Sequence, residues 1–255
     1  MRFEFGQNWL AYVESLRERE LDRAVQSLRD LLACDSLEGK TFLDIGCGTG
    51  LFSLAALQMQ ASSAFAVDAD PKSVEAARRL KSAFAEGDDN WDVAEGSVLD
   101  KDFMDKLPQA NVVYCWGVVH HTGRMWDALR AAADKTAEGG VFVFSIYNRC
   151  WSSPLWLRAK RLYNRSGPVV RLPMTCALFC ARALVRSVRL RNPLRDERGM
   201  STWHDAIDWL GGLPYEFASP AEVREHMREL GFLLLREKLT ARNGCNQFVY
   251  SRPEA

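Results

Sequence analysis

Five short apolar runs alternate with segments of helical spacing along the first 150 residues of the chain. The runs cover residues 41–45, 63–67, 91–95, 111–115 and 141–146. Short apolar runs separated by longer helical segments are typical of strands buried in a parallel sheet. The alternation therefore predicts an α/β fold, a doubly wound and mostly parallel sheet with helices on both faces.

Polar and apolar positions recur every three or four residues in five further segments, which predicts helices there. These segments are residues 8–33, 51–60, 71–86, 124–137 and 220–230. Asp70-Pro71 and Ser219-Pro220 each place a capping side chain before a proline at the first helical position. Two further strands are expected at 232–239 and 247–250, with Asn243-Gly244 in a hairpin turn between them.

Residues 149–198 break this alternation and carry 11 Arg and one Lys against two acidic residues. Leucines and valines at helical spacing predict a helical insertion at 149–215. The insertion divides the sheet domain into two segments, 38–148 and 216–255. We expect residues 1–37 to form an N-terminal helical cap. Three interpretations of the insertion stay open: a lid with a solvated basic face, a lid that holds an anionic acceptor, or a surface for an anionic membrane or a carrier protein.

Composition narrows the function classes. The 255 residues have a formal net charge of zero, which argues against a general nucleic-acid binder. Seven scattered cysteines without a C-x-x-C pair indicate free thiols in a reducing compartment and predict no metal site. The chain shows no signal-peptide pattern and no uninterrupted apolar span, so we expect a cytoplasmic protein without a membrane-spanning segment.

Three glycines follow the first predicted strand, at Gly46, Gly48 and Gly50. A strand, a glycine-rich turn and a helix together let a nucleotide-like ligand approach the backbone. A dinucleotide fingerprint would need glycine where Leu51 stands. Asp44, two residues before the first glycine, would repel a pyrophosphate but suit a ligand that carries sulfonium and ammonium groups.

The segment Leu-Asp-Ile-Gly-Cys-Gly-Thr-Gly at 43–50 resembles the first motif of class I S-adenosylmethionine-dependent methyltransferases of the small-molecule type. The stretch at 111–121, which ends in His120 and His121, resembles a later motif of that family. The resemblance implies a seven-stranded sheet of order 3-2-1-4-5-7-6 whose last strand is antiparallel. It also implies that S-adenosyl-L-methionine is the cofactor and that a leading helix folds over it.

The residues expected to bind the cofactor follow from their positions after the predicted strands and from the family resemblance. Asp68 ends the second strand, 18 residues beyond Gly50, where an acid can accept both ribose hydroxyls. The resemblance implies an adenine contact at Ser97, where family members often carry an acid, together with the backbone of Val98. It also implies that Trp116 borders the methionine part of the cofactor.

Candidates for catalysis and for substrate contact are titratable and polar residues near the predicted strand ends and in the insertion. One of His120 and His121 should face the pocket, although such a pair can also serve structural hydrogen bonds. The candidates for proton transfer are His121, His120, His204, Tyr147 and Asp205. The candidates for substrate contact are Asn148, Trp203, Tyr215, Asn243 and Asn246.

The expected function is in-line methyl transfer to a small-molecule acceptor, which is either anionic or carrier-bound, with no nucleic-acid partner. Positioning of donor and nucleophile supplies most of the catalysis, because the sulfonium is already activated. One alternative is ring closure by the cofactor's own amine with release of methylthioadenosine. A non-catalytic binding module is the second alternative, and a nicotinamide dehydrogenase is disfavoured by Asp44 and Leu51.

Overall fold

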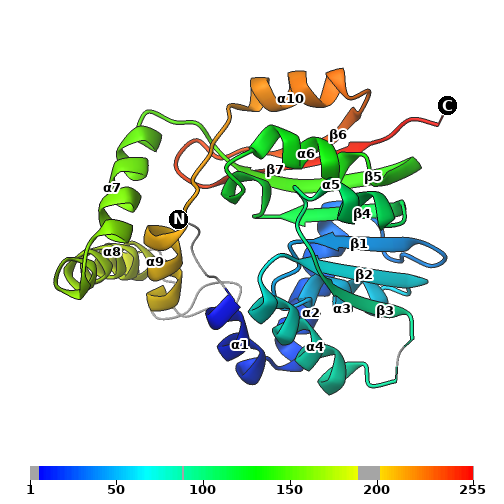
Figure 1. The fold of residues 1–255 in the computed structure, drawn as a ribbon, viewed down its shortest axis with the longest axis horizontal. Coiled ribbons are helices and arrows are strands. Elements are labelled where there is room, and N and C mark those ends of the chain that lie inside the picture. The colour runs from blue at the N-terminus through cyan, green and yellow to red at the C-terminus, as the bar shows by residue number, and fades with distance from the viewer. Residues whose placement is uncertain (1–5, 88, 189–201, 255) are drawn as a thin grey trace. The chain divides into compact units, whose positions relative to one another are not determined.

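A computed structural model describes residues 6–87, 89–188 and 202–254. The chain divides into two compact units. The sheet unit comprises Glu4–Cys150 and Glu216–Ala255, and the helical unit comprises Trp151–Tyr215. Figure 1 shows the strands of the sheet unit and the helices of the helical unit. The N-terminal helices belong to the sheet unit.

The sheet has seven strands in the order β3-β2-β1-β4-β5-β7-β6, which confirms the expected order (Figure 1). The strands are β1 Thr41–Ile45, β2 Ser63–Asp68, β3 Trp91–Glu95, β4 Ala110–Trp116, β5 Thr136–Tyr147, β6 Leu233–Lys238 and β7 Cys245–Ser251. The first five pair in parallel, and β7 is antiparallel to both β5 and β6. Strand β6 therefore runs parallel to β1, and the loop after β6 lies at the same edge as the loop after β1.

Helices cover both faces of the sheet and bury two apolar clusters against it. The helices of this unit are α1 Gly6–Ser15, α2 Glu18–Leu32, α3 Leu51–Gln58, α4 Pro71–Phe84, α5 Lys101–Lys106, α6 Met125–Ala133 and α10 Pro220–Glu229. Asp70 and Ser219 cap α4 and α10 through the backbone N–H groups of Lys72 and Glu222, as predicted. Alternate residues of β1 point to opposite faces, so Phe42 joins one cluster and Leu43 the other.

One predicted boundary is wrong. The helix expected over 124–137 ends at Ala133, and β5 begins at Thr136, before the glycine pair that was expected to stop the helix. Gly139 adopts φ +68°, and the pairing of β4 with β5 shifts register between Ala110 and Val112. The glycine conformation allows a bulge, so the strand continues through the pair.

The helical unit contains α7 Ser153–Arg165, α8 Pro168–Val188 and α9 Thr202–Gly211. Its interior is built around Lys160, which is fully buried. The ammonium donates to the Trp209 carbonyl and lies 4.9 Å from the Trp209 ring centroid and 4.8 Å from that of Tyr215. Aromatic faces and a carbonyl together compensate the buried charge.

Helix α8 bears on the expectation that no segment spans a membrane. By length and composition it is apolar enough to cross a membrane, with a mean hydropathy of 1.5 over its best window, although only 6% of that window is buried. The sequence predicts no span, because Arg171 and Arg182 interrupt the apolar run. Length and composition alone do not distinguish a span from a surface helix.

Candidate functional site

The glycine loop joins the carboxyl end of β1 to α3 and is tied to the end of β2. The N–H groups of Gly46 and Cys47 donate to the Val67 carbonyl over 2.7 and 3.0 Å. Gly46 has φ +71°, and a Cβ there would come within 2.2 Å of a Val118 methyl. Only glycine meets both constraints at this position, so the sequence fixes the loop next to the end of β4.

Helix α1 lies against this loop. The Gly6 N–H donates to Asp70 Oδ2 over 2.9 Å, which ties the start of α1 to the cap of α4. The ring of Trp9 lies close to Gly48, where a Cβ would come within 3.2 Å of the indole. The leading helix thus places an aromatic ring beside the middle glycine of the loop.

Two carboxylates lie at the same edge. Asp68 accepts the Gly48 N–H over 3.0 Å with one oxygen and the Asp70 N–H over 2.9 Å with the other. Asp44 is 2% exposed and accepts the Ser53 hydroxyl over 2.7 Å. Burial, together with the nearby charge of Asp68, raises the pKa of Asp44 from 3.8 to about 7. A cation at this edge would relieve the repulsion between the two carboxylates.

The carboxyl end of β4 provides an open backbone position and a stacked ring. Gly117 has φ +76° with no atom within 4 Å of a Cβ, and its N–H donates to Ser145 Oγ over 3.0 Å. Trp116 stacks on Tyr114 with ring centroids 5.7 Å apart and planes 4° from parallel. The backbone at Gly117 is thus open on its Cβ side, and the Trp116 ring stacks beside it at the end of β4.

Three of the predicted catalytic residues form one cluster. His120 lies 4.0 Å from Tyr147 and 4.6 Å from His121 between ring centroids, and His121 lies 5.5 Å from Tyr147. His120 is 1% exposed, whereas His121 and Tyr147 are half-buried. The structure therefore brings together residues from the ends of β4 and β5, and His121 is the more accessible of the two histidines.

Sequence reasoning missed Glu216, which lies beside this cluster. Its N–H donates to the His120 carbonyl over 3.0 Å, and its Oε1 accepts the Met125 N–H over 3.3 Å. Burial raises the pKa of this carboxyl, and Oε2 is buried without a hydrogen-bond partner among the described residues. A single glutamate after a loop carries no sequence signal, and only the return of the chain to β4 places it here.

The two asparagines predicted for substrate contact at 148 and 246 bond to each other instead. The Asn246 amide donates to Asn148 Oδ1 over 3.1 Å and accepts the Thr240 N–H over 2.9 Å. Asn148 donates to the Thr240 carbonyl over 2.9 Å. Both side chains are buried, so they hold the loop after β6. Asn243, in that loop, accepts a hydrogen bond from Cys150 Sγ over 2.8 Å.

Ser97 and Val98, the two residues predicted to contact adenine, lie in the loop after β3. Val98 is 6% exposed and belongs to the core. Ser97 Oγ accepts the Leu99 N–H over 3.2 Å, and Asp100 caps α5 through the N–H of Phe103. The Ser97 hydroxyl is thus used in a local turn, and its contact with adenine stays a prediction.

The remaining candidates belong to the helical unit. Trp203 packs against Phe179 at 5.7 Å between ring centroids, and Tyr215 is 4% exposed. His204 and Asp205 lie in α9, but their side chains fall outside the described residues. The roles of these four toward the sheet unit stay predictions.

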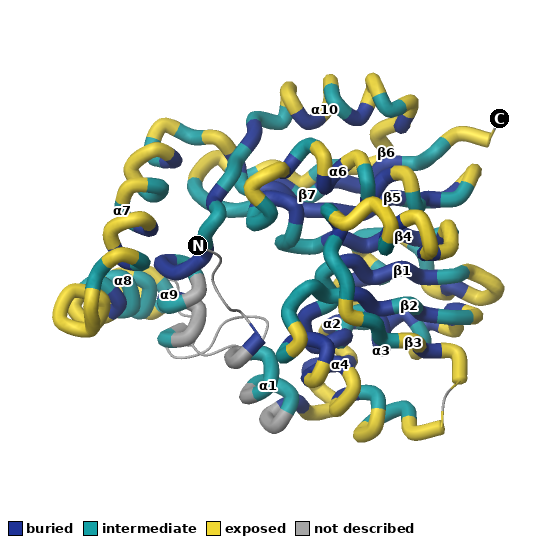
Figure 2. Tube along the Cα trace, in the orientation of Figure 1, coloured by how far each residue is buried: buried dark blue, intermediate teal, exposed yellow. Residues whose placement is uncertain are grey.

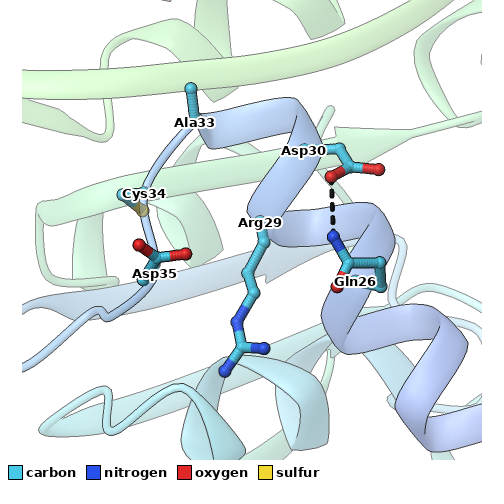
Figure 3. Close-up of a pocket in the computed structure, with 6 residues that line it drawn as sticks. All are labelled: Gln26, Arg29, Asp30, Ala33, Cys34 and Asp35. Carbon is cyan, nitrogen blue, oxygen red and sulfur yellow. Dashed lines mark hydrogen bonds between the residues drawn. The ribbon is translucent and has the colours of Figure 1, made fainter.

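A pocket of about 410 Å³ opens near the end of α2. It is lined by Gln26, Arg29, Asp30, Ala33, Cys34 and Asp35 (Figure 3). These residues lead into the amino end of β1, whereas the glycine loop follows its carboxyl end. The pocket therefore belongs to the opposite edge of the sheet from the candidate site.

Comparisons with known proteins give one consistent family. A family model described as a methyltransferase domain matches residues 16–232. A protein of Pyrobaculum aerophilum named "Probable cobalt-precorrin-6B C(15)-methyltransferase (decarboxylating)" is 36% identical over 113 residues, which are 43% of this chain and 54% of that protein. The chain thus spans about half the length of this curated relative.

Two solved structures share the fold. The magnesium protoporphyrin IX methyltransferase ChlM of Synechocystis PCC 6803, with bound SAH, has a TM-score of 0.56 at 16% identity and covers 99% of this chain and 89% of its own. An O-methyltransferase family protein from Burkholderia thailandensis has a TM-score of 0.57 at 16% identity, and the match covers 92% of this chain and 58% of that protein. These likenesses confirm the expected class I fold.

Proposed function

We propose, from the premise that the chain belongs to the S-adenosylmethionine-dependent methyltransferase family, that it transfers a methyl group to a small-molecule acceptor. The observation that carries the proposal is the pair of carboxylates, Asp44 and Asp68, which lie beside the glycine loop. The charged neighbour that raises the pKa of Asp44 is another acid, so the site favours a cationic ligand. S-adenosylmethionine is such a ligand and supplies an activated methyl group.

Different residues around the glycine loop bind different parts of the cofactor. Asp68 is placed by two backbone N–H groups, and its carboxylate would accept the ribose hydroxyls. The backbone at Gly46, Gly48 and Gly50 permits close approach, as the resemblance implies. Asp44 supplies the negative field for the methionine end, which Trp116 borders.

Methyl transfer needs a base only when the acceptor must lose a proton. His121 is our choice for that role, because it is more exposed than His120 and lies against Tyr147. His120 then acts as a positioning residue: it is buried, and its carbonyl accepts the Glu216 N–H.

A small acceptor is supported by the names of two similar proteins, which specify a precorrin and a protoporphyrin. The test is incubation of the full chain with S-adenosylmethionine labelled in its methyl group and a cell extract. Mass spectrometry then measures the nucleoside products, and the label is followed in fractions separated by size. We expect S-adenosylhomocysteine and label in the small-molecule fraction, both lost in Asp68→Asn.

Other outcomes contradict the proposal. Label in the protein or RNA fraction would show a macromolecular acceptor. Methylthioadenosine formed without any acceptor would show ring closure within the cofactor. Cofactor binding without either nucleoside product would show a binding module.

A further inference from the structure

Large apolar side chains are exposed along the helical unit. They are Trp151, Leu155, Leu162, Val169, Val170, Leu172, Leu184, Val185 and Val188. Three of them, Val169, Trp151 and Val188, are 88%, 86% and 76% exposed. Figure 2 shows exposed turns along much of α7 and α8. Isolated exposed apolar residues are ordinary, but a concentration of this kind marks an interaction surface.

Helix α8 presents its uncharged side to the solvent. At spacings of three and four residues this stripe contains Val169, Pro173, Cys176, Cys180, Leu184 and Val188, all exposed. The opposite side carries the charges and contacts the rest of the unit. The Arg171 Nε donates to the Tyr163 carbonyl over 2.9 Å, and the Arg182 guanidinium lies 5.4 Å from the Trp209 centroid. This orientation is the reverse of that expected for a surface helix in water.

Helix α7 adds cations beside its own exposed leucines. Arg158, Arg161 and Arg165 recur at spacings of three and four residues and are exposed. Leu155 and Leu162 are 52% and 56% exposed on the neighbouring stripe. A helix that pairs leucines with a row of arginines suits a boundary between acyl chains and phosphates.

The charge of the whole chain is segregated. Residues 149–198 hold 12 basic and two acidic residues, whereas the rest of the chain holds 21 basic and 31 acidic residues. An anionic surface would therefore attract the insertion and repel the rest. Such a surface would also complement the exposed apolar stripe of α8 if an apolar layer lay directly beneath its charges.

We propose that the exposed stripe of α8, the row of Arg158, Arg161 and Arg165 on α7, and Trp151 dock on an anionic lipid bilayer, with the helices lying in the headgroup plane. The stripe on α8 is about 30 Å long, from 21 residues at 1.5 Å each. A span is disfavoured because Arg171, Arg182 and Arg186 would enter the bilayer. Thr175 and Phe179 moreover pack against Tyr163 and Trp203. This inference is independent of the methyl-transfer proposal.

The experiment is flotation of the full chain with vesicles of phosphatidylcholine alone or with one third phosphatidylglycerol. We expect binding to the anionic vesicles, weakened by salt, and little binding to the neutral ones. Each arginine near an anionic surface contributes about a fivefold increase in partitioning. The triple variant Arg158→Gln, Arg161→Gln, Arg165→Gln should therefore bind roughly a hundredfold more weakly.

The matched charge control is Lys40→Gln, Lys106→Gln, Lys238→Gln, which removes three exposed cations from the sheet unit and should bind as the wild type does. The apolar contribution is tested separately, with a control of the same kind. Val169→Ser and Leu184→Ser should each reduce partitioning roughly tenfold. Leu233→Ser, at a side chain 59% exposed on β6, should not change it.

Three results would overturn the proposal. The first is that the wild type fails to float with anionic vesicles at low salt. The second is that the arginine triple variant and the lysine triple variant lose binding equally. The third is that sedimentation shows a dimer that Leu184→Ser dissociates while vesicle binding is unchanged, because a second copy would then cover the face. Circular dichroism and S-adenosylmethionine binding confirm that each variant is folded.

Discussion

Replacement of Asp44 by Asn tests the electrostatics of the site. The side chain is buried and accepts a hydrogen bond from Ser53, which an Asn carbonyl can also accept. Burial and the charge of Asp68 raise the pKa from 3.8 to about 7. The folded protein therefore retains a proton that the unfolded chain has lost between these two pH values, so the stability of the wild type falls as pH rises through that window.

Above pH 7, a pKa raised from 3.8 to about 7 lowers the free energy of unfolding of the wild type by about 4 kcal/mol, at about 1.36 kcal/mol per pKa unit. Asn carries no charge, so Asp44→Asn removes this loss of stability. We expect the variant to be more stable than the wild type by about 2 kcal/mol at pH 5 and about 4 kcal/mol at pH 8. Urea unfolding of both proteins across this range measures the difference, and titrating groups that do not interact with Asp44 cancel. Asp92→Asn, at an exposed site on β3, is the control and should shift stability little.

Cofactor affinity should change in the opposite direction. A cationic ligand favours the ionised form of Asp44, so S-adenosylmethionine should bind more tightly to the wild type as pH rises toward 7 and should release a proton. Asp44→Asn should bind at least tenfold more weakly at pH 8 and lose this pH dependence. Calorimetry in buffers of different ionisation enthalpy measures both. A stability difference that is constant with pH, or equal affinity in the variant, would refute the reasoning.

Three further changes test the site and its supports. Asp68→Asn should weaken S-adenosylmethionine binding at least tenfold by calorimetry, since it replaces one of the two carboxylate oxygens by a donor and removes the charge that would accept the ribose hydroxyls, and unchanged affinity would exclude that role. Gly50→Ala should destabilise the protein by about 1–3 kcal/mol in urea, because φ is +75° and a Cβ would lie 2.8 Å from Trp91. Asn246→Ala should cost about 1–3 kcal/mol and speed hydrogen exchange at the Thr240 amide, and full protection there would contradict the contact.

The local parts of the fold were readable from the sequence because they depend on residues close together in the chain. The cap at Asp70 acts on an N–H two residues later, and the glycine loop follows directly from the strand before it. The position of the loop after β6 follows from topology instead, because it requires that strand to be parallel to the first five. The limits of β5 were misjudged because its start depends on pairing with β4.

The tertiary structure decided which groups meet and which faces are covered. Asn246 and Asn148 are 98 positions apart and bond inside the fold, and Glu216 reaches His120 across a similar distance. Spacing in α8 distinguishes an apolar stripe from a charged one, but it cannot say which of the two packs inward. That choice depends on contacts such as that of Arg182 with Trp209, made between segments far apart in the chain. Periodicity is a property of one helix, whereas burial is a property of its neighbours.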